Sequence, residues 1–230
     1  MSRIVLKLSG YIIDEFLLNN QSRLLKILEF IKEDSLREGR KYAIVVGGGS
    51  HARKVINRLR LYKLDEFTLD TIGISISRIN ALIVQSLIKP YVYGKIFNNI
   101  IEASYVFKYK NVNIIVGGFS PGFSTNAVST LLAYLSDAEC LINLTRVGGI
   151  YDRDPQKYDN ARLLRRVRID ELIKILSKHA EYAGHYPLFD SNSLRMIKEW
   201  RIKTYILPPT REALEKLLIH RELIGSEIIV

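Results

Sequence analysis

Short, nearly continuous apolar runs alternate with longer amphipathic segments along this chain, and three of the runs end at glycine. Residues 4–8 are followed by Ser9-Gly10, residues 42–46 by three glycines, and residues 112–116 by Gly117-Gly118. Apolar runs without polar alternation are typical of strands buried on both faces, which occur in parallel sheets covered by helices. The order therefore predicts an α/β protein, a three-layer α/β/α arrangement with a mainly parallel central sheet.

The remaining elements follow from the same periodicity. Helical spacing predicts helices over residues 21–38, 50–61, 74–87, 125–135, 170–178, 193–200 and 210–219, and apolar runs predict further strands at 141–144, 204–207 and 227–230. The irregular segment 150–168 is interpreted as a lobe boundary or a hairpin. Because no Gly/Ser/Pro-rich linker and no repeat interrupts this order, we expect residues 1–230 to form a single domain with at most two lobes.

Composition and charge narrow the function class. The net charge is +10, from 34 Lys+Arg against 24 Asp+Glu, but it is dispersed and no aromatic-rich motif accompanies it. We therefore expect small polyanions such as nucleotides as partners and consider nucleic acid an unfavoured one. The apolar runs are shorter than a membrane span needs, and the N-terminal run is too short for a signal peptide, so a cytoplasmic protein is expected. The histidines lack zinc spacing, and Cys140 has no partner for an internal disulfide, so no metal site is predicted.

Anion-friendly residues follow four of the predicted strands. They are Lys7 with Ser9-Gly10, Gly47-Gly48-Gly49-Ser50, the stretch from Gly117 to Thr125, and the stretch from Thr145 to Tyr151 with Asp154-Pro155. Glycines let the backbone approach a phosphate, and the free amides of a helix start point at it. Each signal alone is weak, since such loops are often plain turns. Together they would converge on one edge of the sheet, where ligands of open α/β proteins bind. No Walker A loop or dinucleotide fingerprint is present.

These residues resemble the amino acid kinase family and, within it, the archaeal-type uridylate (UMP) kinases. The resemblance extends over essentially the whole chain. The motifs that carry it are Lys7-Leu8-Ser9-Gly10, Val46-Gly47-Gly48-Gly49-Ser50-His51-Ala52-Arg53, Asp70-Thr71-Ile72-Gly73, Ser77-Arg78-Ile79-Asn80-Ala81, the stretch from Gly117 to Thr125, and Val147-Gly148-Gly149-Ile150-Tyr151 with Asp154-Pro155.

The resemblance implies Mg²⁺-dependent transfer of a phosphoryl group from ATP to UMP, giving UDP and ADP in pyrimidine nucleotide biosynthesis. It implies that UMP is bound by Gly48, Asp70, Phe119, Ser120, Pro121, Gly122, Phe123, Ser124 and Thr125, and ATP by Ser9, Gly10, Gly49, Arg53, Thr145, Tyr151 and Asp154. Asp70 would accept hydrogen bonds from the ribose hydroxyls, and Ser124-Thr125 would meet the UMP phosphate. Lys7 is the expected catalytic cation, and Mg²⁺ would be carried mainly on the phosphates. Relatives form homohexamers, so a homo-oligomer is also implied.

The chain departs from the family pattern at four positions. Asn126 stands where the family often has Asp, Arg146 and Gly148 change the family's Thr-Asn-Val-Asp-Gly-Val-Tyr, and Arg195 replaces a lysine. Arg146 is interpreted either as a nucleotide contact or as a surface charge, and Arg195 either as a phosphate clamp or as a helix-surface residue. Two alternatives therefore stay open: a kinase of the same fold with another acceptor, and a non-catalytic nucleotide-binding regulator.

Overall fold

A seven-stranded sheet forms the centre of the molecule, and its strands follow the order β3-β2-β1-β4-β8-β9-β7. The computed structural model describes residues 2–19, 22–180 and 189–230. The strands are β1 (Arg3–Leu8), β2 (Lys41–Val46), β3 (Ile114–Val116), β4 (Cys140–Leu144), β7 (Arg166–Arg168), β8 (Thr204–Leu207) and β9 (Ser226–Ile229). Neighbouring strands are parallel except β8 and β9. The predicted mainly parallel sheet is thereby confirmed.

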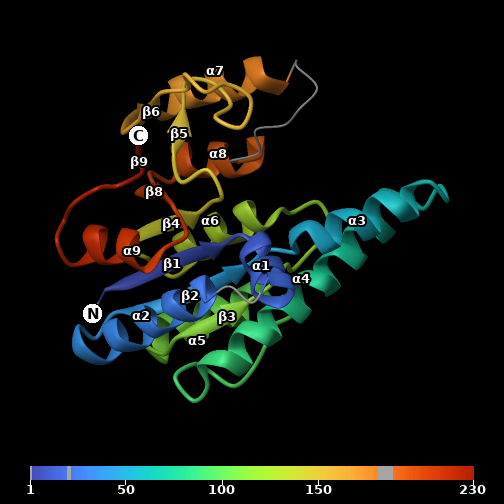
Figure 1. The fold of residues 1–230 in the computed structure, drawn as a ribbon. Helices are drawn as coiled ribbons and strands as arrows, with labels where there is room; N and C mark the ends of the chain where they lie inside the picture. Colours follow the sequence, from blue (N-terminus) through green and yellow to red (C-terminus); the bar gives the residue numbers. More distant parts are fainter. Residues whose placement is uncertain (1, 20–21, 181–188) are drawn as a thin grey trace.

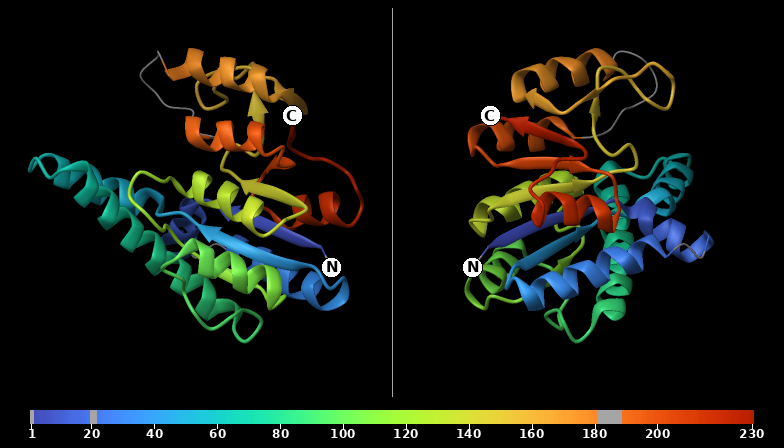
Figure 2. Two further views of the ribbon diagram at one scale, coloured as in Figure 1. Left: turned by 180° about the vertical axis from the view of Figure 1, so that it is seen from behind. Right: turned by 60° about the vertical axis from the view of Figure 1, so that its left-hand side comes forward.

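Helices cover both faces of this sheet (Figures 1 and 2). They are α1 (Gly10–Asn19), α2 (Arg23–Arg37), α3 (Gly49–Arg60), α4 (Glu66–Ile88), α5 (Ile100–Tyr109), α6 (Thr125–Leu135), α7 (Ile169–Ala180), α8 (Ser191–Glu199) and α9 (Arg211–Leu218). Side chains of α1, α2, α4 and α9 share one core with Ile4, Leu6 and Leu8, while α5 and α6 share another with Val5. Successive residues of β1 therefore pack into opposite layers, which explains why Ile4, Val5 and Leu6 are all apolar.

The segment 150–168 contains a hairpin, as one of its two interpretations predicted. Strands β5 (Ile150–Tyr151) and β6 (Leu163–Leu164) pair antiparallel and form a small second sheet. Together with β7, β9, α7 and α8, the hairpin residues pack around a third core. Two helices and one strand, α1, α5 and β7, were not predicted. Gln21, the first residue of the predicted helix 21–38, lies outside the described residues.

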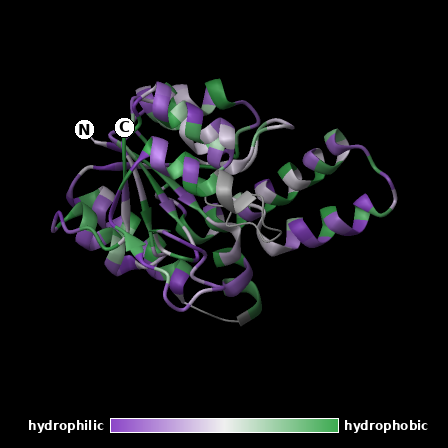
Figure 3. Ribbon diagram, turned by 90° about the horizontal axis from the view of Figure 1, so that it is seen from above, coloured by the Kyte–Doolittle hydropathy of each residue, from purple (hydrophilic) through white to green (hydrophobic). Residues whose placement is uncertain are grey.

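Helix α4 is the longest described helix and runs beside α3, so that the pair projects from the body of the molecule (Figures 1 and 3). Over its 23 residues it is long and apolar enough to cross a membrane by length and composition, which the sequence interpretation did not recognise. A core helix of a soluble protein passes the same test. Polar side chains of α4 are buried in hydrogen bonds to other segments: Asn80 donates to the Gly47 carbonyl oxygen and Gln85 to the Tyr93 carbonyl oxygen. These contacts fix the C-terminal half of α4 against the body of the molecule, while 33% of its most apolar stretch is buried.

Candidate active site

A cleft of about 370 Å³ lies at the carboxyl ends of β1, β2 and β3. Most of the residues predicted for UMP and part of those predicted for ATP line it. The lining residues are Lys7, Ser9, Gly10, Gly47, Gly48, Gly49, Ala52, Arg53, Ile56, Asp70, Gly73, Ile74, Ser77, Gly118, Ser120, Phe123, Ser124 and Thr125. Three loops that are distant in sequence therefore meet at one edge of the sheet, as the strand order predicts for a parallel α/β protein.

Lys7 is the cation at the floor of this cleft. It sits in β1 beside Val45 of β2 and Asn143 of β4. Burial, followed by the nearby positive charge of Arg53, lowers the pKa of Lys7 to about 8. None of the ion pairs in the described part of the chain involves Lys7. An ammonium placed this way is complementary to an anionic ligand, because a bound anion would restore its charged form.

The first two glycine loops pack backbone against backbone. A Cβ atom at Gly10 would lie 2.1 Å from the Gly49 nitrogen, and Gly49 has a φ of +75°, so neither position accepts a side chain without rearrangement. Gly49 is also the first residue of α3, whose free amides and dipole favour an anion. One of these amides is already used, because Ser50 N donates to the Asp14 carboxylate over 2.6 Å. Asp14, on α1, thus fixes the start of α3.

The loop 119–125 closes the other side of the cleft and leads into α6. The Ser124 hydroxyl oxygen accepts from Ala127 N at 3.1 Å and thereby caps this helix. The same hydroxyl donates to the carboxylate of Asp190, the N-cap of α8. Gly122 N donates to Asp70 Oδ2 over 2.7 Å. The side chains of Asp70 and Ser124 therefore hold the loop in its conformation, while Thr125 lies beside the Gly47 turn.

The remaining predicted ATP residues do not line this cleft. Thr145 is buried at the end of β4, where its hydroxyl oxygen accepts from Gly148 N. Tyr151 belongs to the hairpin strand β5, and the Asp154 carboxylate accepts from Gln156 N within a turn. Arg195 lines a separate, largely apolar cavity between α7 and α8. Phe119, Pro121 and Gly122 belong to the loop without lining the cleft.

Comparison with known proteins now assigns the family. The family model described as the amino acid kinase family matches residues 2–208. The chain belongs to the amino acid kinase family. Its relatives within this family include the uridylate kinases of Sulfurisphaera tokodaii, 36% identical over 98% of both chains, and of Sulfolobus acidocaldarius, 32% identical over 99% of both. The crystal structure of uridylate kinase from Archaeoglobus fulgidus superimposes with a TM-score of 0.83 at 30% identity, covering all of both chains. The UMP kinase of Ureaplasma parvum, at 19% identity and a TM-score of 0.75, shares the fold.

In this amino acid kinase, several residues that shape the cleft received no role from the sequence. Asp14, Asp190, Ser77, Arg78 and Asn80 all act through hydrogen bonds to backbone or side-chain groups of the cleft loops. The bonded partners lie between 33 and 66 residues apart in the chain. Only the fold brings such pairs together. The sole signal in the sequence was that Ser77-Arg78-Ile79-Asn80 matched the family.

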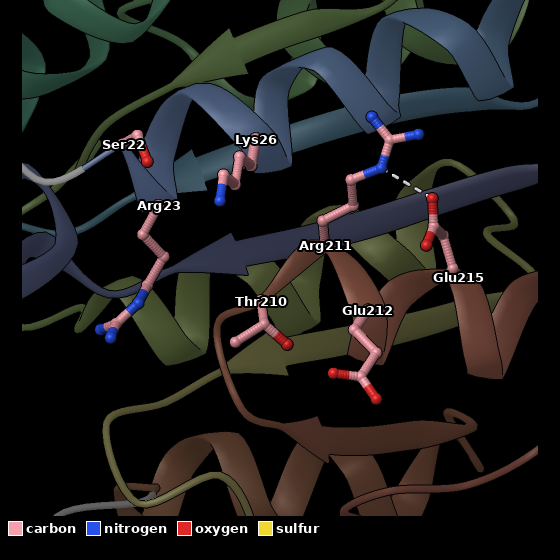
Figure 4. A pocket seen from close by; sticks show the side chains of 7 residues that line it. All are labelled: Ser22, Arg23, Lys26, Thr210, Arg211, Glu212 and Glu215. Atoms are coloured by element: carbon pink, nitrogen blue, oxygen red, sulfur yellow. Dashed lines mark hydrogen bonds and ion pairs between the residues drawn. The ribbon is translucent and has the colours of Figure 1, made fainter.

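A second cavity, of about 690 Å³, lies between the N-terminal ends of α2 and α9 (Figure 4). Its lining mixes charges of both signs, from Arg23, Lys26, Arg211, Glu212 and Glu215. Arg211 pairs with Glu215 within the cavity wall, and Arg23 pairs with Glu15 of α1. No glycine loop lines it. The cavity therefore lacks the glycine loops, with their close backbone approach, that make the cleft around Lys7 suitable for phosphates.

Proposed function

We propose that this protein is a uridylate kinase, which transfers the γ-phosphoryl group of ATP to UMP and releases UDP and ADP. The observation that carries the proposal is the cleft in which Lys7, the glycine loops after β1 and β2, and the loop 119–125 meet. Full-length relatives named uridylate kinase support the choice of acceptor. As a phosphotransferase site, the cleft would supply positioning and positive charge, which are the main requirements of this chemistry.

The two substrates would enter from opposite sides of Lys7. On the acceptor side, Gly48, Asp70 and the loop 119–125 bind UMP: the second carboxylate oxygen of Asp70 receives the ribose hydroxyls, and the start of α6 at Thr125 meets the phosphate. On the donor side, the triphosphate of ATP lies along Ser9, Gly10, Gly49 and Arg53. The nucleoside of ATP extends towards Thr145, Tyr151 and Asp154, which is consistent with their position outside the cleft.

In the reaction, an oxygen of the UMP phosphate attacks the γ-phosphorus. The bond between the γ-phosphorus and its bridging oxygen breaks, and the electron pair leaves with ADP. Negative charge shifts along this line, and the ammonium of Lys7 stabilises it with the amides of the glycine loops. The described residues contain no cluster of three or more His, Cys, Asp or Glu side chains that could hold a metal. Mg²⁺ would arrive on the ATP phosphates and neutralise part of their charge, since this ion commonly keeps several waters and takes few protein ligands.

Two of the departures from the family pattern, at Gly148 and Asn126, are compatible with this activity. Gly148 has a φ of +73°, and a Cβ atom there would lie 3.0 Å from Pro208, so the turn after β4 favours glycine at this position. The side-chain amide of Asn143 donates to the Asn126 side-chain oxygen at 3.4 Å. Asn143 is the residue of β4 that pairs with Lys7 of β1. Neutral amides can orient groups around a lysine, but they cannot offset its charge.

We further propose that residues 1–230 form one domain and that the protein acts in cytoplasmic pyrimidine nucleotide biosynthesis. We also propose that it is a homo-oligomer, a hexamer by family resemblance. Large exposed apolar side chains on α4 and α5 support association: Phe67, Ile101, Tyr105 and Tyr109 each expose more than half of their surface. Light scattering of the purified protein tests this proposal. A mass equal to the 26.4 kDa monomer would contradict it.

The activity is tested by incubating the protein with Mg²⁺ and ATP and, in separate reactions, UMP, CMP, AMP, GMP, isopentenyl phosphate or carbamate, and separating the products by chromatography. We expect selective formation of UDP. Efficient turnover of another acceptor would overturn the assignment of UMP as the substrate, but it would leave the assignment of kinase activity in place. Binding of UMP and ATP without any product would overturn the assignment of kinase activity and indicate a nucleotide-binding protein that does not catalyse the transfer.

A further inference from the structure

Three polar side chains on one turn of α4 hold the backbone of two cleft loops. Asn80, which is 7% exposed, donates through Nδ2 to the Gly47 carbonyl oxygen at 2.9 Å. The Ser77 hydroxyl accepts from Gly118 N at 2.7 Å. Arg78 donates from Nε to the Gly118 carbonyl oxygen at 3.0 Å and from Nη2 to that of Phe119 at 3.3 Å. These bonds link α4 to the loops that follow β2 and β3.

Arg78 differs in its surroundings from Arg23, Arg40 and Arg211, which are also half-buried, whereas Arg3 likewise donates to a backbone carbonyl, that of Ser136. Arg40 and Arg211 form ion pairs with carboxylates, whereas none of the ion pairs in the described residues involves Arg78. Its guanidinium is instead committed to two successive backbone carbonyls, and charge-assisted bonds of this kind are stronger than neutral ones. The side chain therefore fixes the backbone where the loop leaves β3.

The loop is consequently held at two points by the same helix. Arg78 holds the carbonyls at its start, and Asp70, two helical turns earlier on α4, holds the amide of Gly122. The helix cannot easily shift beneath the loop: a Cβ atom on Gly117 would lie 2.8 Å from the Arg78 nitrogen, which shows how closely the backbones approach. Asn80 anchors the same turn to the end of β2.

We propose that Arg78 is a positioning residue for the acceptor: it sets the conformation of loop 119–125 in which UMP binds, without itself being required for phosphoryl transfer. The assignment of the acceptor rests on the proposed function. Removal of Arg78 should therefore weaken UMP binding and leave the donor side unchanged. Lysine cannot bond both carbonyls in the fork geometry of arginine, so it should restore charge but only part of the positioning.

The test compares Arg78→Ala and Arg78→Lys with the wild-type chain in steady-state kinetics. For Arg78→Ala we expect KM for UMP to rise on the order of 10-fold or more, the scale of a lost charge-assisted bond, with KM for ATP within about twofold. The KM for UMP of Arg78→Lys should lie between the values of the wild type and of Arg78→Ala. Arg58→Ala serves as the matched control, because it removes an exposed arginine of α3 that stacks on Tyr62 and does not touch the loop. An unchanged KM for UMP, or an equal rise in both KM values, overturns the proposal.

Amide hydrogen exchange without nucleotide provides a readout that does not depend on turnover. In Arg78→Ala, peptides covering residues 117–125 should exchange faster than in the wild type, while peptides of β1 and β2 should be unchanged. Unaltered exchange in 117–125 overturns the positioning role. If the wild-type protein forms no UDP, the proposed function fails, and exchange still decides whether Arg78 holds the loop.

Discussion

Lys7 occupies a strand whose neighbouring side chains are almost completely buried, so its charge has a cost that the fold must offset elsewhere. Ile4, Val5, Leu6 and Leu8 are each 1% exposed or less. A lysine in such a run is often an edge residue whose amine reaches water along its aliphatic chain. Here β1 is central in the sheet, with β2 on one side and β4 on the other, and the side chain ends in the cleft. Two predictions follow from this residue.

Replacing Lys7 by Met should abolish most of the activity and stabilise the fold. The substitution removes the cation that would stabilise the transferring phosphoryl group, so we expect kcat to fall by roughly 10²–10³-fold. It also removes a charge that burial disfavours, so the melting temperature at pH 7 should rise by a few degrees. Initial rates and thermal unfolding measure the two effects. Lys54→Met, at an exposed position of α3, is the control, and retention of activity in Lys7→Met would exclude the catalytic role.

The pH profile should also report Lys7. Its pKa is lowered to about 8 from an ordinary value of 10.5, so the free enzyme loses this positive charge as the pH rises through 8. We expect kcat/KM for UMP to fall above about pH 8, because the deprotonated amine cannot stabilise negative charge. The profile is measured between pH 6 and pH 10 with a fixed ionic strength. A plateau extending to pH 10 would mean that the pKa of Lys7 is not lowered in the free enzyme.

At the scale of elements, the sequence identified strands and helices with clear periodicity and missed those without it. The α1 segment is apolar on nearly all sides, and its first residue, Gly10, looks like the end of a strand. The α5 segment has a detectable start, because the Asn99 side chain accepts from the amides of Ile101 and Glu102. The predicted helix 74–87 begins earlier, at Glu66, where Asp65 caps it through Thr68 N. Capping residues were thus the unused signal.

A buried polar network joins α2 to β2 and should contribute strongly to stability. The Asp34 carboxylate, 3% exposed, accepts from Arg40 and, at 2.6 Å, from the Tyr42 hydroxyl. Asp34→Ala leaves both donors without this partner, so we expect the free energy of unfolding to fall by about 3–5 kcal/mol. Tyr42→Phe removes one bond and should cost about 1 kcal/mol. Denaturant unfolding measures both, and equal losses in the two variants would contradict the network.

At the scale of the whole molecule, the sequence predicted the cleft better than the region beyond it. Lys7, the glycine loops and the helix starts follow directly from strands, and parallel strands bring their carboxyl ends to one edge. The positions of Tyr151 and Asp154 depend instead on the hairpin β5–β6. That hairpin is anchored by Ser226 of β9, whose hydroxyl accepts from Ile150 N and donates to the Leu164 carbonyl oxygen. Such contacts, between residues more than 60 positions apart, have no local signature.

The continuous sheet also predicts how the chain unfolds. Strand pairing runs without a break from β3 to β7, and β9, the last strand of the chain, lies between β8 and β7. Because the C-terminal strand completes the sheet, we expect one cooperative thermal transition, with the calorimetric enthalpy equal to the van't Hoff enthalpy per cooperative unit. Scanning calorimetry at two protein concentrations makes the measurement. Two resolved transitions would instead indicate that the segments around the third core unfold separately from the rest of the sheet.

The two sides of the cleft differ in how much sequence change they can accept, and this difference bears on how such an enzyme diversifies. At Gly10 and Gly49 the two backbones are in contact, so almost any substitution there would disrupt the packing of the loops. The loop 119–125 is more open at Phe123, which is 44% exposed, whereas Gly122, with a φ of +80°, also favours glycine. Selection or directed evolution for a new acceptor should therefore accumulate its changes in this loop and inherit the donor half intact.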